Sequence, residues 1–167
     1  MRCSVRFRLA ALALAAAPSA HKHPRPAAVE RFVYVGTYTV GVPPGGTHPS
    51  EAVGIYVFRM DPRDGDLTPV QTVPADNPSF LALDPALDHV YSVNELTDGR
   101  VSAYAIDAAT GKLTFLNTAS ANGRDTTHLS VHPSGLYLLA ANYSSGNFPV
   151  FRILPDGRIG PMTDEFQ

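Results

Sequence analysis

The chain has 167 residues, 44% of them hydrophobic, and its 13 Lys and Arg nearly balance its 15 Asp and Glu, which gives a formal net charge of -2. This length and composition predict one soluble globular domain with a hydrophobic core of its own. The basic residues are scattered along the chain, which excludes the concentrated positive surface that nucleic-acid binding requires.

The first twenty residues have the three-part order of a secretory signal peptide. Three arginines precede an apolar run, Leu9–Ala17, and small residues follow it. The run is too short to span a membrane, so we expect residues 1–20 to be removed and the mature protein to be secreted or periplasmic, without membrane contact. If the segment is an uncleaved apolar helix instead, the protein stays cytoplasmic. Cys3 is the only cysteine, so no disulfide is expected after cleavage.

Residues 21–30 contain prolines and histidines without a strand pattern, and we interpret them as a flexible leader. From Arg31 the chain becomes rich in β-branched and aromatic residues. Strands are predicted in RFVYVGTYT, GIYVFRMD and LTPVQTV. A long loop rich in Gly and Pro follows the first of them. PRDGD forms a tight turn between the other two, because Asp64 and Gly65 tolerate a left-handed backbone.

Two groups of four strands follow in the same order. The first is predicted in NPSFLALDP, HVYSVNEL, RVSAYAID and KLTFLNTA, and the second in HLSVHP, LYLLAANY, FPVFRIL and RIGPMT. Pro85 and Asn94 recur as Pro133 and Asn142, 48 residues later. Equivalent turns, 46 residues apart, hold Gly65, Gly111 and Gly157. Such a period made of short strands is typical of a β-propeller, in which each four-stranded antiparallel sheet is one blade.

The repeat divides the chain into three blades, at residues 31–75, 76–121 and 122–167. Nothing before Arg31 resembles NPSFLALDP, so the first blade lacks its innermost strand. A closed ring needs at least about four blades. We therefore expect an all-β fold, a partial β-propeller whose remaining blades follow Gln167. Its open blade faces and strand edges should make the isolated chain self-associate.

Two features of the third blade carry specific expectations. Leu136–Ala141 is almost wholly apolar, as expected for a central strand that is buried on both faces. Pro149 lies in the third strand and cannot donate a hydrogen bond to the ladder, so a bulge or local break is expected there.

Polar residues gather on one predicted rim, because antiparallel pairing places the beginning of a blade's first strand beside the end of its second strand. The residues on this rim, beside the central channel, are Thr37, Tyr38, Asp76, Asn77, Asn94, Glu95, Arg124, Asp125, His128, Asn142 and Tyr143. Convergent polar groups beside a channel make this rim the default ligand face. His89 and His132 fall toward the opposite rim.

His128 and Glu95 are the catalytic candidates. His128 replaces Phe80 of the preceding blade, and an imidazole is a common acid or base near neutral pH; the alternative is a hydrogen-bonded wall histidine. Glu95 is a candidate base or ligand anchor. Arg124 with Asp125 is either a surface pair or an anion site.

Six of the other rim residues are candidates for substrate binding. They are Arg124, Asn94, Asn142, Tyr143, Thr37 and Tyr38. Asn94 and Asn142 recur at equivalent positions, which favours a structural role such as binding the backbone of a neighbouring loop. The chain contains no motif for a metal, a nucleotide or a covalent nucleophile, so no cofactor is expected.

Seven segments between Arg31 and Gly160 carry a family resemblance in their joint order: VYVGTYT, GIYVFRMDPRDGDLTPV, NPSFLALDP, YSVNEL, VSAYAIDAATGKLTFLN, HLSVHPSGLYLLAANYSSG and LPDGRIG. Together they resemble the start of the bacterial lactonase family of seven-bladed propellers, which includes the propeller-form 6-phosphogluconolactonases and has carboxymuconate cycloisomerases as fungal relatives. The resemblance implies seven blades and the metal-free hydrolysis of a small-molecule sugar lactone. In that reaction a base activates water, and cationic or hydrogen-bonding groups stabilise the oxyanion.

The family's strongest catalytic candidates, a His-x-His motif and a later Glu and Arg, would lie after Gln167. This chain matches NEL with Glu95 and HLSV with His128, and it has Thr126 and Thr127 where Pro-Cys is common. The resemblance implies a lactone hydrolase when full length and an inactive isolated chain. The expected export favours a lactone other than the phosphorylated cytosolic one. The alternatives are a non-enzymatic propeller module that binds a ligand or a protein, and a muconate-type cycloisomerase.

Overall fold

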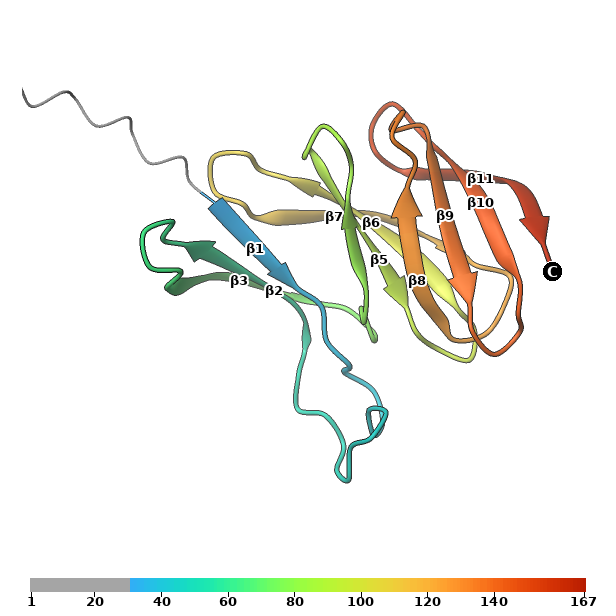
Figure 1. The fold of residues 1–167 in the computed structure, drawn as a ribbon, viewed down its shortest axis with the longest axis horizontal. Coiled ribbons are helices and arrows are strands. Elements are labelled where there is room, and N and C mark those ends of the chain that lie inside the picture. The colour runs from blue at the N-terminus through green and yellow to red at the C-terminus, as the bar shows by residue number, and fades with distance from the viewer. Residues whose placement is uncertain (1–30) are drawn as a thin grey trace, which may run out of the picture.

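A computed structural model describes residues 31–167 of the chain. This part contains eleven strands and no helix, arranged as three antiparallel sheets that lie side by side (Figure 1). The all-β prediction and the partial propeller are therefore confirmed. No helix in residues 31–167 has the length and apolar character needed to cross a bilayer. The expected signal peptide and leader, residues 1–30, lie outside the described residues.

The three sheets are consecutive meanders. The first sheet has the order β1 (Arg31–Val35), β2 (Gly54–Met60), β3 (Leu67–Pro74). The second has the order β4 (Leu81–Leu83), β5 (His89–Asn94), β6 (Arg100–Ile106), β7 (Leu113–Ser120). The third comprises β8 (Thr126–Val131), β9 (Tyr137–Asn142), β10 (Phe148–Ile153) and β11 (Ile159–Phe166). The first sheet holds three strands, as predicted for a blade without its innermost strand.

The outer hairpin of each sheet turns at a glycine with positive φ, at the equivalent positions Gly65, Gly111 and Gly157. The N–H of Gly65 donates to the carbonyl oxygen of Asp61 at 2.8 Å, and that of Gly111 donates to Asp107 at 2.7 Å. A left-handed backbone strains residues that carry a Cβ, so glycine is the favoured residue at these turns. The 46-residue spacing seen in the sequence is the spacing of these turns.

Two hydrophobic cores lie between the sheets. The core between the first and second sheets contains Ile55, Val57, Val90, Tyr104 and Leu113. The core between the second and third contains Tyr91, Val93, Val101, Ala103, Leu129, Leu138, Ala140, Phe151, Ile153 and Ile159. The middle sheet is therefore covered on both faces, and β5 is buried from Val90 to Asn94. Burial of apolar area at about 25 cal/mol per Å² is what holds the sheets together.

The third sheet is covered on one face only. Leu138 and Ala140 of β9 are buried against the second sheet, whereas Leu139 and Ala141 are half-buried. Leu136, just before the strand, is 44% exposed. The prediction that Leu136–Ala141 is buried on both faces is therefore wrong for the outer face. The reason is that no sheet within residues 31–167 packs on that face.

A β-bulge recurs in the outer hairpin of every sheet. The register between the last two strands of each sheet shifts after Val57, after Ala103 and after Val150. In the third sheet the ladder between β9 and β10 includes no residue before Val150, whereas Pro149 pairs with Glu165 of β11. The local break predicted at Pro149 is confirmed, because proline has no N–H to donate. The bulge itself belongs to the repeat, since the second sheet has it in strands that contain no proline.

Amide side chains join neighbouring sheets at repeated positions. Gln71 of β3 accepts a hydrogen bond from the N–H of Leu113 at 2.7 Å and donates to its carbonyl oxygen at 3.1 Å. Asn117 of β7 does the same with Ile159, at 3.0 and 2.8 Å. Both members of the pair recur after 46 residues. We call these two-bond contacts amide clamps; each one pins the outermost strand of the following sheet.

Candidate functional site

The candidate site lies where the inner strands of the three sheets approach one another. β4 is the innermost strand of the second sheet and β8 that of the third, and these two strands are in contact. Tyr38 follows β1, Glu95 follows β5, and Ser79 and Phe80 precede β4. Together with His128 of β8, these side chains form what we call the inner-rim cluster. The rim predicted from strand order thus contains Tyr38, Glu95 and His128.

Glu95 is held at one carboxylate oxygen by two hydroxyl groups. The Tyr38 hydroxyl donates to Oε2 at 2.7 Å, and the Ser79 hydroxyl donates to the same oxygen at 2.6 Å. Within residues 31–167, Oε1 of this half-buried side chain has no hydrogen-bond partner. Two hydroxyl donors on one oxygen fix the orientation of the carboxyl group. The arrangement therefore offers an oriented oxygen that can accept a hydrogen bond from a ligand.

Tyr38 responds to the same contact. Burial raises the pKa of its phenol, and the hydrogen bond to Glu95 and the charge of that carboxylate raise it further. The phenol therefore stays protonated, and keeps donating to Glu95, beyond the pH at which a free tyrosine ionises.

Asn77 ties the backbone segments that carry Tyr38 and Glu95. Its Oδ1 accepts hydrogen bonds from the N–H groups of Thr39 and Val40, both at 2.8 Å. Its Nδ2 donates to the carbonyl oxygen of Glu95 at 3.0 Å. Asn77 has a φ of 40°, which asparagine tolerates better than most residues. The strand-order rule placed Asn77 on the rim, and the structure assigns its amide to holding the rim together.

The close approach of the first and second sheets depends on Gly36, which follows β1. A Cβ at this position would lie 1.9 Å from the carbonyl oxygen of Pro78. Any side chain would therefore push the segment that leads to Tyr38 away from the second sheet.

Phe80 and His128 contact each other across the boundary between the second and third sheets. Their ring centroids are 4.3 Å apart and their planes are inclined at 53°. Both side chains are exposed, and Phe80 is 37% exposed. The repeat aligned these two residues as equivalent positions, but it did not predict that they touch.

Asn94 and Asn142 are buried and bind backbone, as their recurrence favoured. Nδ2 of Asn94 donates to the carbonyl oxygen of Asp76 at 2.7 Å, and Nδ2 of Asn142 donates to that of Ala121 at 2.8 Å. Their Oδ1 atoms accept hydrogen bonds from the hydroxyls of Ser102 and Thr126, both at 2.7 Å. Each asparagine thus fixes the connection that leads from the preceding sheet into its own.

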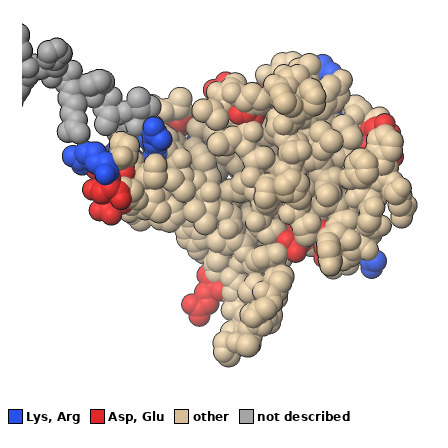
Figure 2. Space-filling view, in the orientation of Figure 1, with Lys and Arg blue, Asp and Glu red and all other residues tan. Residues whose placement is uncertain are grey.

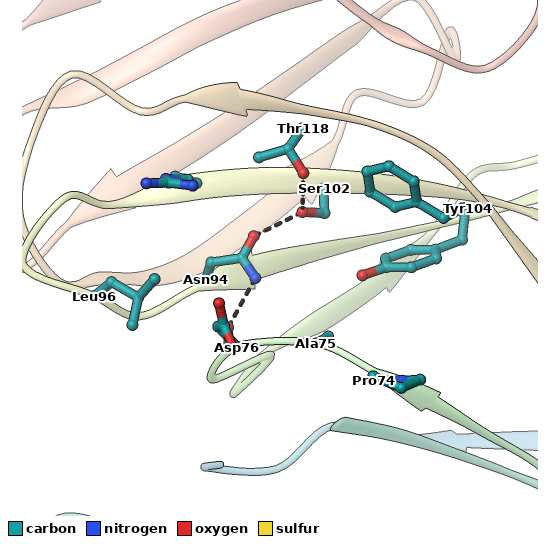
Figure 3. Close-up of a pocket in the computed structure, with 10 residues that line it drawn as sticks. Pro74, Ala75, Asp76, Asn94, Leu96, Ser102, Tyr104 and Thr118 are labelled. Carbon is teal, nitrogen blue, oxygen red and sulfur yellow. Dashed lines mark hydrogen bonds between the residues drawn. The ribbon is translucent and has the colours of Figure 1, made fainter. Parts of the chain in front are cut away.

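Asn94 also lines a small pocket between the first and second sheets, shown in Figure 3. Its volume is about 180 Å³. Asn94, Ser102 and Thr118 point toward one another there and are joined by hydrogen bonds, while Asp76 lies across from them. Because these polar groups already bind one another, the pocket offers a ligand few unused partners.

The other predicted substrate-binding residues lie apart from the inner-rim cluster. Thr37 donates its hydroxyl hydrogen bond to the carbonyl oxygen of Gly54 at 2.7 Å. Arg124 is exposed, and its backbone N–H donates to the Ser145 hydroxyl at 2.9 Å. Tyr143 is 80% exposed. The described part of the chain has no hydrogen bond between these three side chains and Glu95 or His128.

Ser79 was missed by sequence reasoning. It stands 48 residues before Thr127, so the same position of the repeat holds a hydroxyl residue near the start of each inner strand. That recurrence is the signal that could have singled it out.

Charge and metal chemistry add little to this site. Figure 2 shows few charged side chains on the face it presents, and those present are scattered. In residues 31–167 no three His, Cys, Asp or Glu side chains come together in a group that could hold a metal ion. The site therefore consists of one anchored carboxylate, an imidazole, hydroxyl groups and an aromatic ring.

Comparisons with known proteins agree with this architecture. A family model described as lactonase, 7-bladed beta-propeller, matches residues 32–167. The 6-phosphogluconolactonase of Bacillus subtilis (strain 168) is 37% identical over 135 residues, which are 79% of this chain and 36% of that protein. A 6-phosphogluconolactonase of Formosa agariphila is 32% identical over 138 residues, 80% of this chain and 36% of that protein.

One solved structure adds a relative that is described as periplasmic. The periplasmic gluconolactonase PpgL of Pseudomonas aeruginosa is 29% identical, with a TM-score of 0.72, and the match covers 82% of this chain and 38% of that one. The chain thus spans a little over a third of the length of each of these relatives.

Proposed function

Because the chain belongs to the lactonase family of seven-bladed β-propellers, we propose that it forms one sector of a propeller that hydrolyses a sugar lactone. The observation that carries this proposal is the inner-rim cluster, which presents an oriented carboxyl group just after β5 and a solvent-accessible imidazole on the inner strand β8. The activity belongs to the complete ring, and the 167-residue chain by itself is expected to be inactive.

The proposed substrate is a neutral sugar lactone, and the proposed location is the periplasm or the exterior. The signal-like order of residues 1–20 supports export. A relative described as a periplasmic gluconolactonase supports the same compartment. The inner-rim cluster contains one acidic side chain, that of Glu95, and no Lys or Arg that could pair with a phosphate, whereas a carboxyl group accepts hydrogen bonds from substrate hydroxyls.

In the proposed reaction His128 acts as a general base. It takes a proton from water as the water oxygen bonds to the lactone carbonyl carbon, and the carbonyl oxygen becomes an oxyanion. The tetrahedral intermediate then collapses, the bond between that carbon and the ring oxygen breaks, and the proton passes from His128 to the leaving oxygen. The product is the open-chain sugar acid. Glu95 accepts hydrogen bonds from substrate hydroxyls through Oε1 and so fixes the lactone against the base.

The other rim residues take two kinds of role in this proposal. Arg124 and Tyr143 are exposed donors outside the inner-rim cluster, and we assign them to the hydroxyl groups at the far end of the substrate. Asn94, Asn142 and Thr37 act indirectly, because their side chains already bind backbone. Tyr38 fixes Glu95.

A chimera tests the proposal. Residues 32–167 replace the matching segment of the Bacillus subtilis relative, and hydrolysis of gluconolactone and of its phosphorylated form is followed by acid release. We expect activity in the chimera. His128→Ala should lower kcat/KM about 100-fold, the usual size of a general-base contribution. Activity on muconate-type substrates instead would favour the cycloisomerase reaction.

His132→Ala is the matched control. His132 is exposed and binds the Ser134 hydroxyl within its own turn, away from the inner-rim cluster, so its loss should leave turnover unchanged. A folded chimera that hydrolyses no lactone contradicts the proposed function. If a folded His128→Ala chimera keeps the turnover of the parent chimera, His128 is a structural residue of the channel wall and the general base lies in another blade.

A further inference from the structure

Phe80 is an aromatic residue with no evident structural task. It stands directly before β4, yet it belongs to neither hydrophobic core. Its ring is 37% exposed and its one ring contact is with the exposed His128. Scattered exposed apolar residues are normal on protein surfaces, so exposure alone decides nothing. The position of this ring relative to the polar groups of the site does.

The ring adjoins the anchored carboxylate through the backbone. Ser79, the residue before Phe80, donates its hydroxyl hydrogen bond to Glu95 Oε2 at 2.6 Å. Alternate residues of β4 face opposite sheets, since Leu81 packs against the core shared with the first sheet and Ala82 against the core shared with the third. The Phe80 ring lies on the side of the third sheet, where it meets His128 at 4.3 Å between centroids. The Ser79 hydroxyl and the Glu95 carboxyl group lie on the other side of the same inner edge.

This combination matches the two chemical sides of a sugar ring. A sugar lactone carries hydroxyl groups around its ring and C–H bonds on its faces. The carbons bear oxygen, which leaves their hydrogens slightly positive, and the face of an aromatic ring is slightly negative. A carboxylate accepts strong hydrogen bonds from hydroxyl groups. Small-molecule sites commonly combine an aromatic wall with a few placed polar groups.

We propose that the Phe80 ring is the wall on which the C–H face of the sugar lactone packs, while Glu95 Oε1 accepts hydrogen bonds from its hydroxyls. This assignment rests on the proposed lactone hydrolysis and adds the residue that selects a ring-shaped, carbohydrate-like substrate. His128, inclined at 53° to Phe80, lies at the edge of that wall, beside the carbonyl of a lactone packed there.

The sequence contains no tryptophan, so an introduced tryptophan reports on its own position alone. Phe80→Trp places a single indole on the proposed wall, and gluconolactam, a hydrolysis-resistant analogue of the lactone, is titrated into the 167-residue chain. We expect a saturable change in indole emission. Phe115→Trp is the matched control: Phe115 is also exposed and also packs beside an aromatic ring, that of Tyr104, but it lies on the outermost strand β7. Its emission should not respond.

Affinity measurements by calorimetry complete the test. Phe80→Ala should weaken lactam binding about ten-fold, the effect of losing one good aromatic contact. Phe80→Tyr keeps the ring and should bind within about two-fold of the parent. Phe80→Leu keeps apolar bulk without the ring and should resemble Phe80→Ala. Circular dichroism establishes that each variant is folded.

The outcomes separate this inference from the function on which it rests. Phe80 is not the wall if Phe80→Ala binds lactam as well as the parent chain does, or if the emission of both tryptophan variants responds alike. In that case the proposed lactone hydrolysis is still tested separately by the activity of the chimera. If Phe80→Leu binds as the parent does, apolar bulk and not the aromatic face is what the ligand uses, and the inference is overturned. If the parent chain binds no lactam and the chimera is inactive, the proposed lactone hydrolysis and the assignment of Phe80 are both contradicted.

Discussion

Glu95 is oriented by two hydroxyl groups that donate to one of its carboxyl oxygens. One of these donors, Tyr38, has a raised pKa as a result of its surroundings. The carboxylate and the phenol are coupled, because the negative charge and the hydrogen bond both oppose ionisation of Tyr38, after burial as the main cause. The contact can therefore be detected without any substrate.

We predict that Tyr38 ionises above its ordinary value of 10.0. Since the folded state holds the phenolic proton more tightly than the unfolded state, this group has no effect on stability well below pH 10.0 and lowers stability as pH rises through and above that value. Ultraviolet absorbance of phenolate is measured as a function of pH for the parent chain and for Tyr38→Phe. The difference between the two curves gives the ionisation of Tyr38. Glu95→Gln should move the Tyr38 transition toward lower pH. An unmoved transition would mean that the Glu95 contact is absent in solution.

At the scale of single residues, strand order predicted which side chains share an edge of the sheets, and their roles stay predictions. Tyr38 and Glu95 were placed on one edge by strand direction, and the structure joins them by a hydrogen bond. Ser79 and the contact between Phe80 and His128 were not predicted. A repeat reports which residues occupy equivalent positions in different blades, but equivalence carries no information about which of them touch.

At the scale of the strands, the amide clamps make a specific prediction. Asn117→Ala leaves the N–H and carbonyl oxygen of Ile159 without their partner at a boundary between sheets. We expect the free energy of unfolding to fall by about 1–3 kcal/mol, the cost of unpaired buried polar groups. Urea unfolding at low protein concentration measures it. Lys112→Ala, at an exposed turn position of the same hairpin, should change stability by less than about 0.5 kcal/mol.

If Asn117→Ala and Lys112→Ala are equally mild, the clamp does not contribute to stability in solution. Gln71→Ala provides the independent repeat of the test at the other boundary, because it removes the same pair of bonds from Leu113.

The strands themselves were predictable, since turn glycines and alternating residues repeat with a fixed period. The clamps were not, although Gln71 and Asn117 stand 46 residues apart. Gln and Asn side chains differ in length, and the residue that each one binds lies in the following sheet, so the pattern of a single sheet does not reveal the contact. The bulge was expected only near Pro149, yet it recurs in the second sheet, whose two strands at the bulge contain no proline. A local pattern shows where a strand runs and leaves its register undetermined.

At the scale of the whole molecule, both ends of the row of sheets are open. The outer face of the third sheet exposes Phe148 and Phe166 and leaves Leu139 half-buried. Within the described residues, β1 pairs only with β2. The pattern of β9 had predicted burial on both faces, but burial depends on a neighbouring sheet, which no pattern within the strand can report.

We predict that the 167-residue chain associates through these surfaces, because apolar faces and open strand edges favour contact with another copy. Sedimentation velocity over a range of concentrations should show species larger than a monomer. Leu139→Lys places a charge on the uncovered face and should reduce association. Leu87→Lys, at an exposed turn, should not. A chain that stays monomeric at every concentration contradicts the prediction.

The clamps have a consequence for what fixes one sheet to the next. Gln71 and Asn117 bind main-chain atoms of the next sheet, so the side chains at positions 113 and 159 are not parties to the bonds. The identity of these two residues is set by the hydrophobic cores in which both are buried, and the bonds are the same with Leu at one position and Ile at the other. One sheet is thus attached to the next by a contact that the side chain of the bound residue does not define.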